Sequence, residues 1–205
     1  MKKNFRGYLT MAITRSKKLD VRNLTYLAVF TAIVFVLQLL SFFTRGPVFS
    51  LTFVLVPIVI AVAICGTKAG PWLGFVFGVA VLVTGDANAF LAIDPVATVA
   101  VVLIKGTLAG LASALVYKLL AEKNKYLAIC LAAITAPVVN SGVFFLGSLL
   151  FFTEALSAWA PESQSVVVYI ITGLIGFNFI IEVGVNLILV PTIHRIIEIA
   201  SKRKR

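Results

Sequence analysis

The sequence predicts an all-α integral membrane protein, a bundle of six transmembrane helices with both termini in the cytoplasm. Three observations predict this fold class: an apolar composition, six long apolar stretches, and a one-sided distribution of basic residues. Of the 205 residues, 60% are hydrophobic and 13% are charged, whereas soluble domains have about 45–50% and about 25%. This composition excludes a soluble globular domain and a disordered chain.

Six apolar stretches are the candidate membrane spans. A hydrocarbon core needs roughly 20 apolar residues in helical form, and runs of about 17–25 residues are typical. Each stretch carries few charges and is separated from the next by a polar break. The spans are expected at residues 24–43, 49–65, 69–84, 96–120, 126–152 and 166–193.

The breaks between the spans contain Gly, Pro or charged residues that favour turns and loops. They lie at residues 44–47, 66–68, 85–88, 122–125 and 153–165. The fourth span follows Asp94 and Pro95. An aspartate ahead of a proline is an ordinary helix start, because the carboxylate caps the first N–H groups and proline suits the first turn. We therefore expect Asp94 to be a cap rather than part of a gate.

The basic residues orient the chain. Sixteen of the 18 Lys and Arg residues lie on the side of the amino terminus, Arg45 lies alone on the other side, and Lys105 lies within the fourth span. By the positive-inside rule, both termini are cytoplasmic. We expect a basic amino-terminal segment at 1–23, a membrane domain at 24–197 and a basic tail at 198–205.

The net charge of +10 is explained by this orientation, so we expect the lipid bilayer as a partner and no nucleic acid. The amino-terminal segment is too broken in its apolar content to be a signal peptide, and we expect no cleavage. Together these features fit a multi-pass protein of a bacterial plasma membrane.

Polar residues within the spans are the candidate functional residues, because an ionisable group in a bilayer costs roughly 2.5–3.5 kcal/mol. Lys105 and Glu182 are the deep ones. Asn178 and Asn186 stand four residues on either side of Glu182 and share its helix face. Asn140, in the fifth span, lies at a depth comparable with that of Lys105.

Two interpretations of these residues stay open at this point. In the first, they form a substrate-binding chamber open to the exterior, with Asn88 at its outer end, asparagines binding hydroxyl or amide groups and Lys105 meeting a carboxylate. In the second, Lys105 pairs with Glu182 and the asparagines bond across helices as structural contacts.

Small residues form a second pattern, at a four-residue spacing that allows helix backbones to approach closely. They are Gly70, Gly74 and Gly78, then Gly106 and Gly110, and Ala28 with Ala32. We expect most of them simply to pack the bundle.

No catalytic motif is present: the sequence has no GxxxxGK[ST] loop for ATP, no HExxH and no GxSxG. The chain has one His and two dispersed Cys residues, which do not make a metal site or a disulfide framework. We expect neither an enzyme nor a bound cofactor or metal. Concentrative transport would need an ion gradient or a separate motor.

At this point the sequence resembles the substrate-binding S components of energy-coupling factor (ECF) vitamin transporters. Six spans in about 200 residues, cytoplasmic termini and the run Ala28-Val29-Phe30-Thr31-Ala32 in the first span carry the resemblance. Within that family it looks most like the pantothenate-type members. The features shared with those members are Leu51-Thr52-Phe53, Val56-Pro57, Gly70 to Gly78, Ile93-Asp94-Pro95 and the stripe from Asn178 to Asn186.

The resemblance implies an assembly with a membrane T subunit and two cytosolic ATPases. In such an assembly the S component binds its vitamin from outside and topples in the membrane to deliver it. The small-residue motif docks on the T subunit, and this role transfers to Ala28 and Ala32.

For pantothenate, we expect Lys105 to meet the carboxylate while Asn140 and Asn178 take the hydroxyl and amide groups. Glu182 is either protonated, paired with Lys105, or a ligand for a cationic vitamin such as thiamine. The alternative function is a self-sufficient proton-coupled carrier that uses Glu182 as its proton site and needs no motor.

Overall fold

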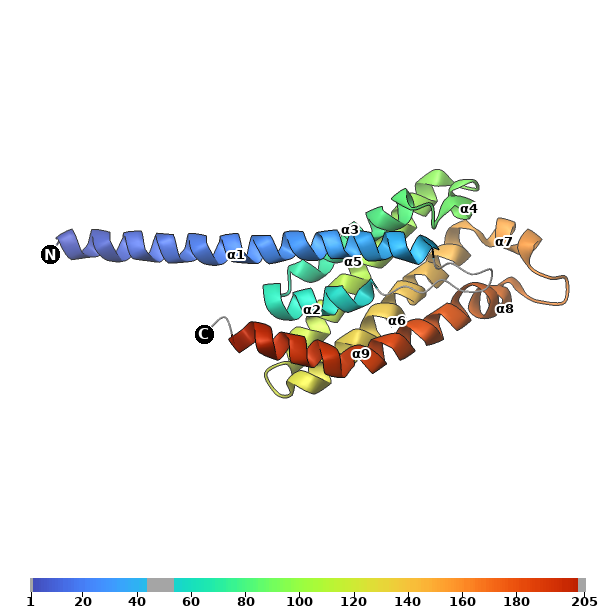
Figure 1. Cartoon of the computed structure of the whole chain (residues 1–205). Coiled ribbons are helices and arrows are strands. Elements are labelled where there is room, and N and C mark those ends of the chain that lie inside the picture. The colour runs from blue at the N-terminus through green and yellow to red at the C-terminus, as the bar shows by residue number, and fades with distance from the viewer. Residues whose placement is uncertain (1, 44–53, 203–205) are drawn as a thin grey trace.

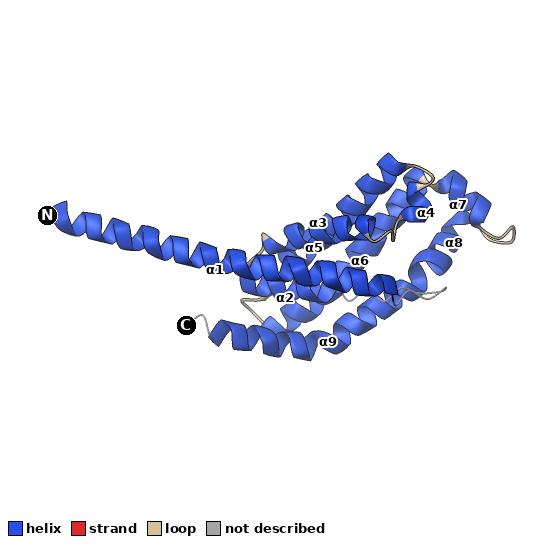
Figure 2. Ribbon diagram, turned by 45° about the horizontal axis from the view of Figure 1, so that its top comes forward, coloured by secondary structure: helices blue, strands red, loops and turns tan. Residues whose placement is uncertain are grey.

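The computed structural model describes residues 2–43 and 54–202, and within these ranges every regular element is helical (Figures 1 and 2). The predicted all-α class is therefore confirmed for the described residues. The elements are α1 (Lys2–Phe43), α2 (Leu55–Cys65), α3 (Ala69–Val83), α4 (Asn88–Leu91), α5 (Pro95–Leu120), α6 (Lys125–Phe151), α7 (Thr153–Trp159), α8 (Val166–Tyr169), the π-helical segment η1 (Ile170–Gly176) and α9 (Phe177–Lys202).

Four helical stretches are long and apolar enough to cross a membrane: Val21–Ser41, Pro95–Leu120, Lys125–Phe151 and Val166–Ala200. Helices α2 and α3 are apolar but shorter, with 11 and 15 residues. The six-span count thus stays a prediction, and residues 49–53 of the second predicted span, like the break at 44–47, lie outside the described residues. The predicted bounds of the third, fourth and fifth spans agree with α3, α5 and α6 to within one residue.

The first and last helices are longer than predicted. Helix α1 begins at Lys2 and runs for 42 residues, so the basic amino-terminal segment continues the first span as one helix and projects beyond the bundle (Figure 1). Helix α9 continues past the expected end of the sixth span to Lys202. Both ends of the described chain lie at the same end of the bundle, with α4, α7 and α8 at the opposite end (Figure 1). Their placement in the cytoplasm remains a prediction.

Helix α2 is the central helix of the bundle. It packs against α1, α3, α5, α6 and α9, and its side chains from Ile58 to Val62 are all buried. A helix that is apolar on every side is suited to such a position, because all of its faces meet other helices. Its neighbours complete two clusters of buried residues around it, one toward α1 and α3 and one toward α6 and α9.

Helices α3 and α5 meet backbone to backbone through glycine. A Cβ atom placed on Gly74 would overlap the carbonyl oxygen of Gly106, and one on Gly70 would overlap that of Gly110. The relation is reciprocal, since Cβ atoms on Gly106 and Gly110 would overlap the carbonyl oxygens of Gly74 and Gly70. The small-residue pattern therefore serves packing between these helices, as expected.

Side-chain hydrogen bonds attach α1 to α3 and to the turn that follows it. The indole Nε1 of Trp72 donates to Thr31 Oγ1 at 3.1 Å. Near the opposite end of the bundle, Nε2 of the buried Gln38 donates to a carboxylate oxygen of Asp86. In a lipid environment these contacts give polar side chains the partners that lipid does not provide.

The π-helical segment sets the rotation of the last span. In an uninterrupted α-helix, Ile170 and Glu182 would point about 120° apart, because each residue turns the helix by about 100°. A π-helical turn holds an extra residue, which brings the two side chains to within about 20° of each other. Both are buried in the bundle, so η1 lets the two halves of this span face the same interior.

The glycine contact between α3 and α5 predicts a position-specific cost. Alanine stabilises an exposed helix position by about 0.8–1 kcal/mol relative to glycine, but at Gly74 its methyl group must push two backbones apart. We expect Gly74→Ala to lower the free energy of unfolding in detergent by about 1–3 kcal/mol through overpacking, and hence to lower the melting temperature.

Gly142 provides the matched control, because a Cβ atom there meets no atom within 4 Å. Gly142→Ala should leave the melting temperature unchanged or raise it slightly. Equal melting temperatures for the two variants would contradict the backbone contact.

Candidate functional site

Helix α6 lies between α5 and α9, and two hydrogen bonds fix its register against them. The hydroxyl of Ser113 in α5 donates to the carbonyl oxygen of Ala132 at 3.1 Å. Asn186 Nδ2 in α9 donates to the carbonyl oxygen of Ala133, also at 3.1 Å. Both donor residues are almost completely buried, at 0% and 1% exposure.

Pro137 explains why Asn186 bonds at this point. The carbonyl of Ala133 would normally accept the N–H of residue 137, but proline has no N–H and its ring crowds that carbonyl. Pro137 lies inside α6, so the amide of Asn186 supplies the missing donor. The amide nitrogen of Asn186 therefore makes a structural contact between α9 and α6.

The same register places Lys105 opposite the middle of α6. Ser113 lies against Ala132, and Val101 packs where a Cβ atom of Gly147 would be, so the antiparallel pairing sets Lys105 level with residues near 140–144. Its Nζ lies 5.0 Å from the centroid of the Phe144 ring, within the range of a cation–π interaction.

Glu182 is the electrostatic partner of Lys105. Its side chain is buried, at 8% exposure, and its carboxylate attracts the Lys105 ammonium. A charge removed from water needs such a counter-charge or strong hydrogen bonds. The two deep ionisable groups predicted from the sequence are thus brought into one electrostatic environment.

One face of α6 carries unpartnered polar atoms beside this pair. Asn140, Phe144 and Ser148 are spaced by four residues and share that face. Asn140 is 8% exposed and Ser148 0%, and neither Asn140 Oδ1 nor Ser148 Oγ has a hydrogen-bond partner within residues 2–43 and 54–202. A buried polar atom without a partner costs about 1–3 kcal/mol, and Gln38 Oε1 is a further such atom elsewhere in the bundle.

Sequence reasoning missed Ser148, because a lone serine in an apolar helix ordinarily bonds to its own backbone. The available signal was its spacing of eight residues from Asn140, which places both side chains on the same side of the helix.

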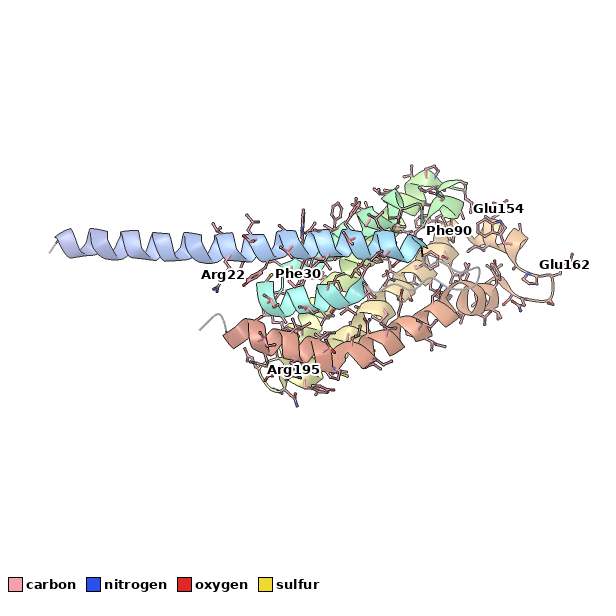
Figure 3. All side chains as sticks on the ribbon, viewed as in Figure 1. Arg22, Phe30, Phe90, Glu154, Glu162 and Arg195 are labelled. Carbon is pink, nitrogen blue, oxygen red and sulfur yellow. The ribbon has the colours of Figure 1, made fainter. Side chains whose placement is uncertain are left out.

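A group of aromatic side chains in mutual contact lies at the end of the bundle away from the termini. Phe90 in α4 makes edge-type contacts with three rings, with centroid distances of 5.4 Å to Phe144, 5.1 Å to Phe152 and 5.9 Å to Trp159. Figure 3 shows Phe90, Glu154 and Glu162 toward this end, and Arg22 and Arg195 toward the other. The labelled acidic and basic side chains thus lie toward opposite ends of the bundle.

The remaining predicted residues are placed differently. Asn88 is exposed at the start of α4, with its amide folded against Gly85, where a Cβ atom would lie 2.8 Å from Asn88 Nδ2. It is not brought to the interior. Asn178 is partly buried near the start of α9, on the face it shares with Glu182. Asp94 caps α5 as predicted, because its Oδ1 accepts the backbone N–H of Ala97 at 2.9 Å.

Ala28 and Ala32 are exposed on α1, which leaves their small surfaces available to a partner. Within the described ranges, no three His, Cys, Asp or Glu side chains lie close enough together to hold a metal ion.

Comparisons with known proteins identify the type of chain. A family model described as "ECF transporter, substrate-specific component" matches residues 22–194. Among solved structures, the fold is similar to that of ThiT from Listeria monocytogenes, with a TM-score of 0.65 and 19% sequence identity over 87% of this chain and 98% of that chain. No curated protein matches the chain.

The contact between Asn186 and the carbonyl freed by Pro137 predicts non-additive mutations. Asn186→Ala leaves that buried carbonyl without a donor, and we expect the free energy of unfolding in detergent to fall by about 1–3 kcal/mol. Pro137→Ala restores a backbone N–H at position 137. In that background Asn186→Ala should cost clearly less, and an equal cost in both backgrounds would show that the two residues are not coupled.

Proposed function

The chain belongs to the family of substrate-specific components of ECF transporters, and from this premise we propose that it captures a vitamin from outside the cell. We propose pantothenate as that vitamin. The observation that supports pantothenate most is the Lys105 ammonium within the bundle. It lies beside a helix face on which the amide oxygen of Asn140 has no partner among the described residues. Uptake would be powered by partner subunits, a membrane T subunit and two ATPases, since the sequence has no ATP-binding loop of its own.

Pantothenate offers groups that complement these residues. Its carboxylate suits the Lys105 ammonium, because a charge-assisted hydrogen bond is among the stronger polar contacts. Its hydroxyl and amide N–H groups are donors, which suits Asn140 Oδ1, with Asn178 as a second amide on α9. The apolar remainder of the molecule suits the rings of Phe144 and Phe90.

Glu182 decides between an anionic and a cationic vitamin. It attracts Lys105, so an anionic ligand must share the ammonium with it or bind while Glu182 is protonated. A cationic vitamin such as thiamine would instead use Glu182 directly. The buried position of Glu182 makes its charge strongly felt by either ligand.

The outer surface of α1 supports the proposed docking on the T subunit. Ala28 and Ala32 are both exposed, and small residues at this spacing let another helix approach closely. This surface lies on a different helix from Lys105, Asn140 and Glu182. Vitamin binding and partner docking should therefore be separable by mutation.

A self-sufficient proton-coupled carrier with Glu182 as its proton site is the alternative. Membership in a family of substrate-specific components does not favour it. Uptake into vesicles that contain the chain alone, driven by a pH gradient, would support this alternative. Uptake that requires partner subunits and ATP would support the S-component function.

We predict opposite effects of neutralising the two deep charges if pantothenate is the ligand. Lys105→Met should weaken pantothenate binding roughly ten- to hundredfold, because a charged hydrogen bond is lost. Glu182→Gln should tighten pantothenate binding, because a repelling carboxylate is removed. Isothermal titration of the purified variants measures both changes. If Lys105→Met leaves the affinity unchanged, the carboxylate assignment is wrong, and weaker vitamin binding by Glu182→Gln would indicate a cationic ligand.

We also predict that Ala32→Trp blocks uptake and spares binding. The indole should prevent close contact with the T subunit while leaving the interior intact. The measurement compares vitamin affinity in detergent with ATP-driven uptake in proteoliposomes that contain the partner subunits. Ile188→Trp, at a position 77% exposed on α9, is the control and should preserve both properties. Loss of binding together with uptake in Ala32→Trp would contradict separate surfaces.

A further inference from the structure

Hydroxyl groups in the helices of this protein usually bond to their own backbone. Donors on five helical stretches reach the carbonyl four residues earlier at 2.6–2.9 Å, which satisfies the hydroxyl where lipid cannot. These donors are Thr25, Thr31, Ser41, Thr98, Thr107, Thr135, Thr153 and Thr172. Ser113 instead donates across helices to Ala132.

Ser148 departs from this pattern. Its side chain is 0% exposed, and its Oγ makes no hydrogen bond to any described residue. The backbone bond that other hydroxyls make was available to it, because the carbonyl four residues earlier, that of Phe144, also lies within α6. An unpaired hydroxyl in the interior of the bundle is costly, so its position calls for a partner that the described residues do not supply.

The direction of the side chains brings Ser148 and Lys105 to a common level. Helix side chains tilt toward the amino-terminal end of their own helix. Helices α5 and α6 are antiparallel, so the long Lys105 side chain extends toward the end of the bundle where α5 begins, the end of Phe90 and Ser148. Its Nζ reaches the Phe144 ring, one turn of α6 from Ser148. Asn140 lies about 12 Å from Ser148 along the axis, on the deeper side of that ring.

We propose that Ser148 is a further ligand-binding residue of this site and that it fixes the direction in which the ligand lies. Ser148 Oγ and Lys105 Nζ are both donors, and together they fit an acceptor group, a carboxylate. Asn140 Oδ1 is an acceptor and fits a hydroxyl or amide N–H. The carboxylate end of the ligand therefore lies toward the aromatic end of the bundle, and its donor end lies deeper, at Asn140. This inference rests on the proposed function and adds a residue and a binding direction to it.

The test is a titration of the purified full-length chain with pantothenate and with pantothenol, in which an alcohol replaces the carboxylate. Ser148→Ala should weaken pantothenate binding roughly ten- to hundredfold, the range for a hydrogen bond to a charged group. It should weaken pantothenol binding much less. Ser148→Cys, close in size and a weaker donor, should give an intermediate loss and keeps the test usable if the alanine variant folds poorly.

Thr135→Ala is the matched control on the same helix, because its hydroxyl is exposed and bonds to Leu131. It should leave both affinities unchanged. Wild-type affinity for pantothenate in both Ser148 variants would overturn the inference, since a hydroxyl that only holds a buried water has no effect on the ligand. An equal loss for pantothenate and pantothenol would overturn the binding direction. A wild-type chain that binds neither compound would contradict the proposed function itself, which the wild-type titration reveals separately.

Discussion

The structure depends on the requirement that polar groups inside a bilayer find their partners within the protein. Hydroxyls bond to their own helix, Ser113 and Asn186 bond to adjacent carbonyls of α6, and Gln38 bonds to Asp86. Pro137 shows how strict the requirement is, because the carbonyl that it deprives of a donor is the one that Asn186 reaches. The close packing of α5, α6 and α9 follows from these contacts as much as from apolar burial.

The same requirement distinguishes polar atoms that have a protein partner from those that do not. The Asn186 amide nitrogen and the Ser113 hydroxyl have protein partners, whereas Asn140 Oδ1 and Ser148 Oγ have none in the part of the chain that the structure describes. These two atoms lie on the α6 face next to the Lys105 ammonium. Asn186 and Ser113 therefore make structural contacts between helices, and a ligand-binding role for the other polar residues is our proposal. Glu182 attracts the Lys105 ammonium, whose Nζ lies 5.0 Å from the centroid of the Phe144 ring.

Composition and spacing predicted much of the fold, and their failures have physical reasons. Apolar runs between polar breaks located α3, α5 and α6 closely, and Asp94 before Pro95 identified a helix cap. The central position of α2 was not predictable, because an apolar run does not say which neighbours surround it. The π-helical segment has no simple sequence signature, so the burial of Ile170 together with Glu182 could not be foreseen. The role of Asn186 required knowing that Ala133 lies opposite it, and the exposed position of Asn88 beside Gly85 depends on the short helix that Asn88 begins.

The central claim is that the interior of this bundle holds a vitamin without help from any other subunit. An equilibrium titration of the purified chain in detergent against a panel of B vitamins, pantothenate first, tests it most directly. The account predicts saturable binding of one vitamin at nanomolar to micromolar concentration. Absence of binding across the whole panel by a correctly folded chain would contradict it.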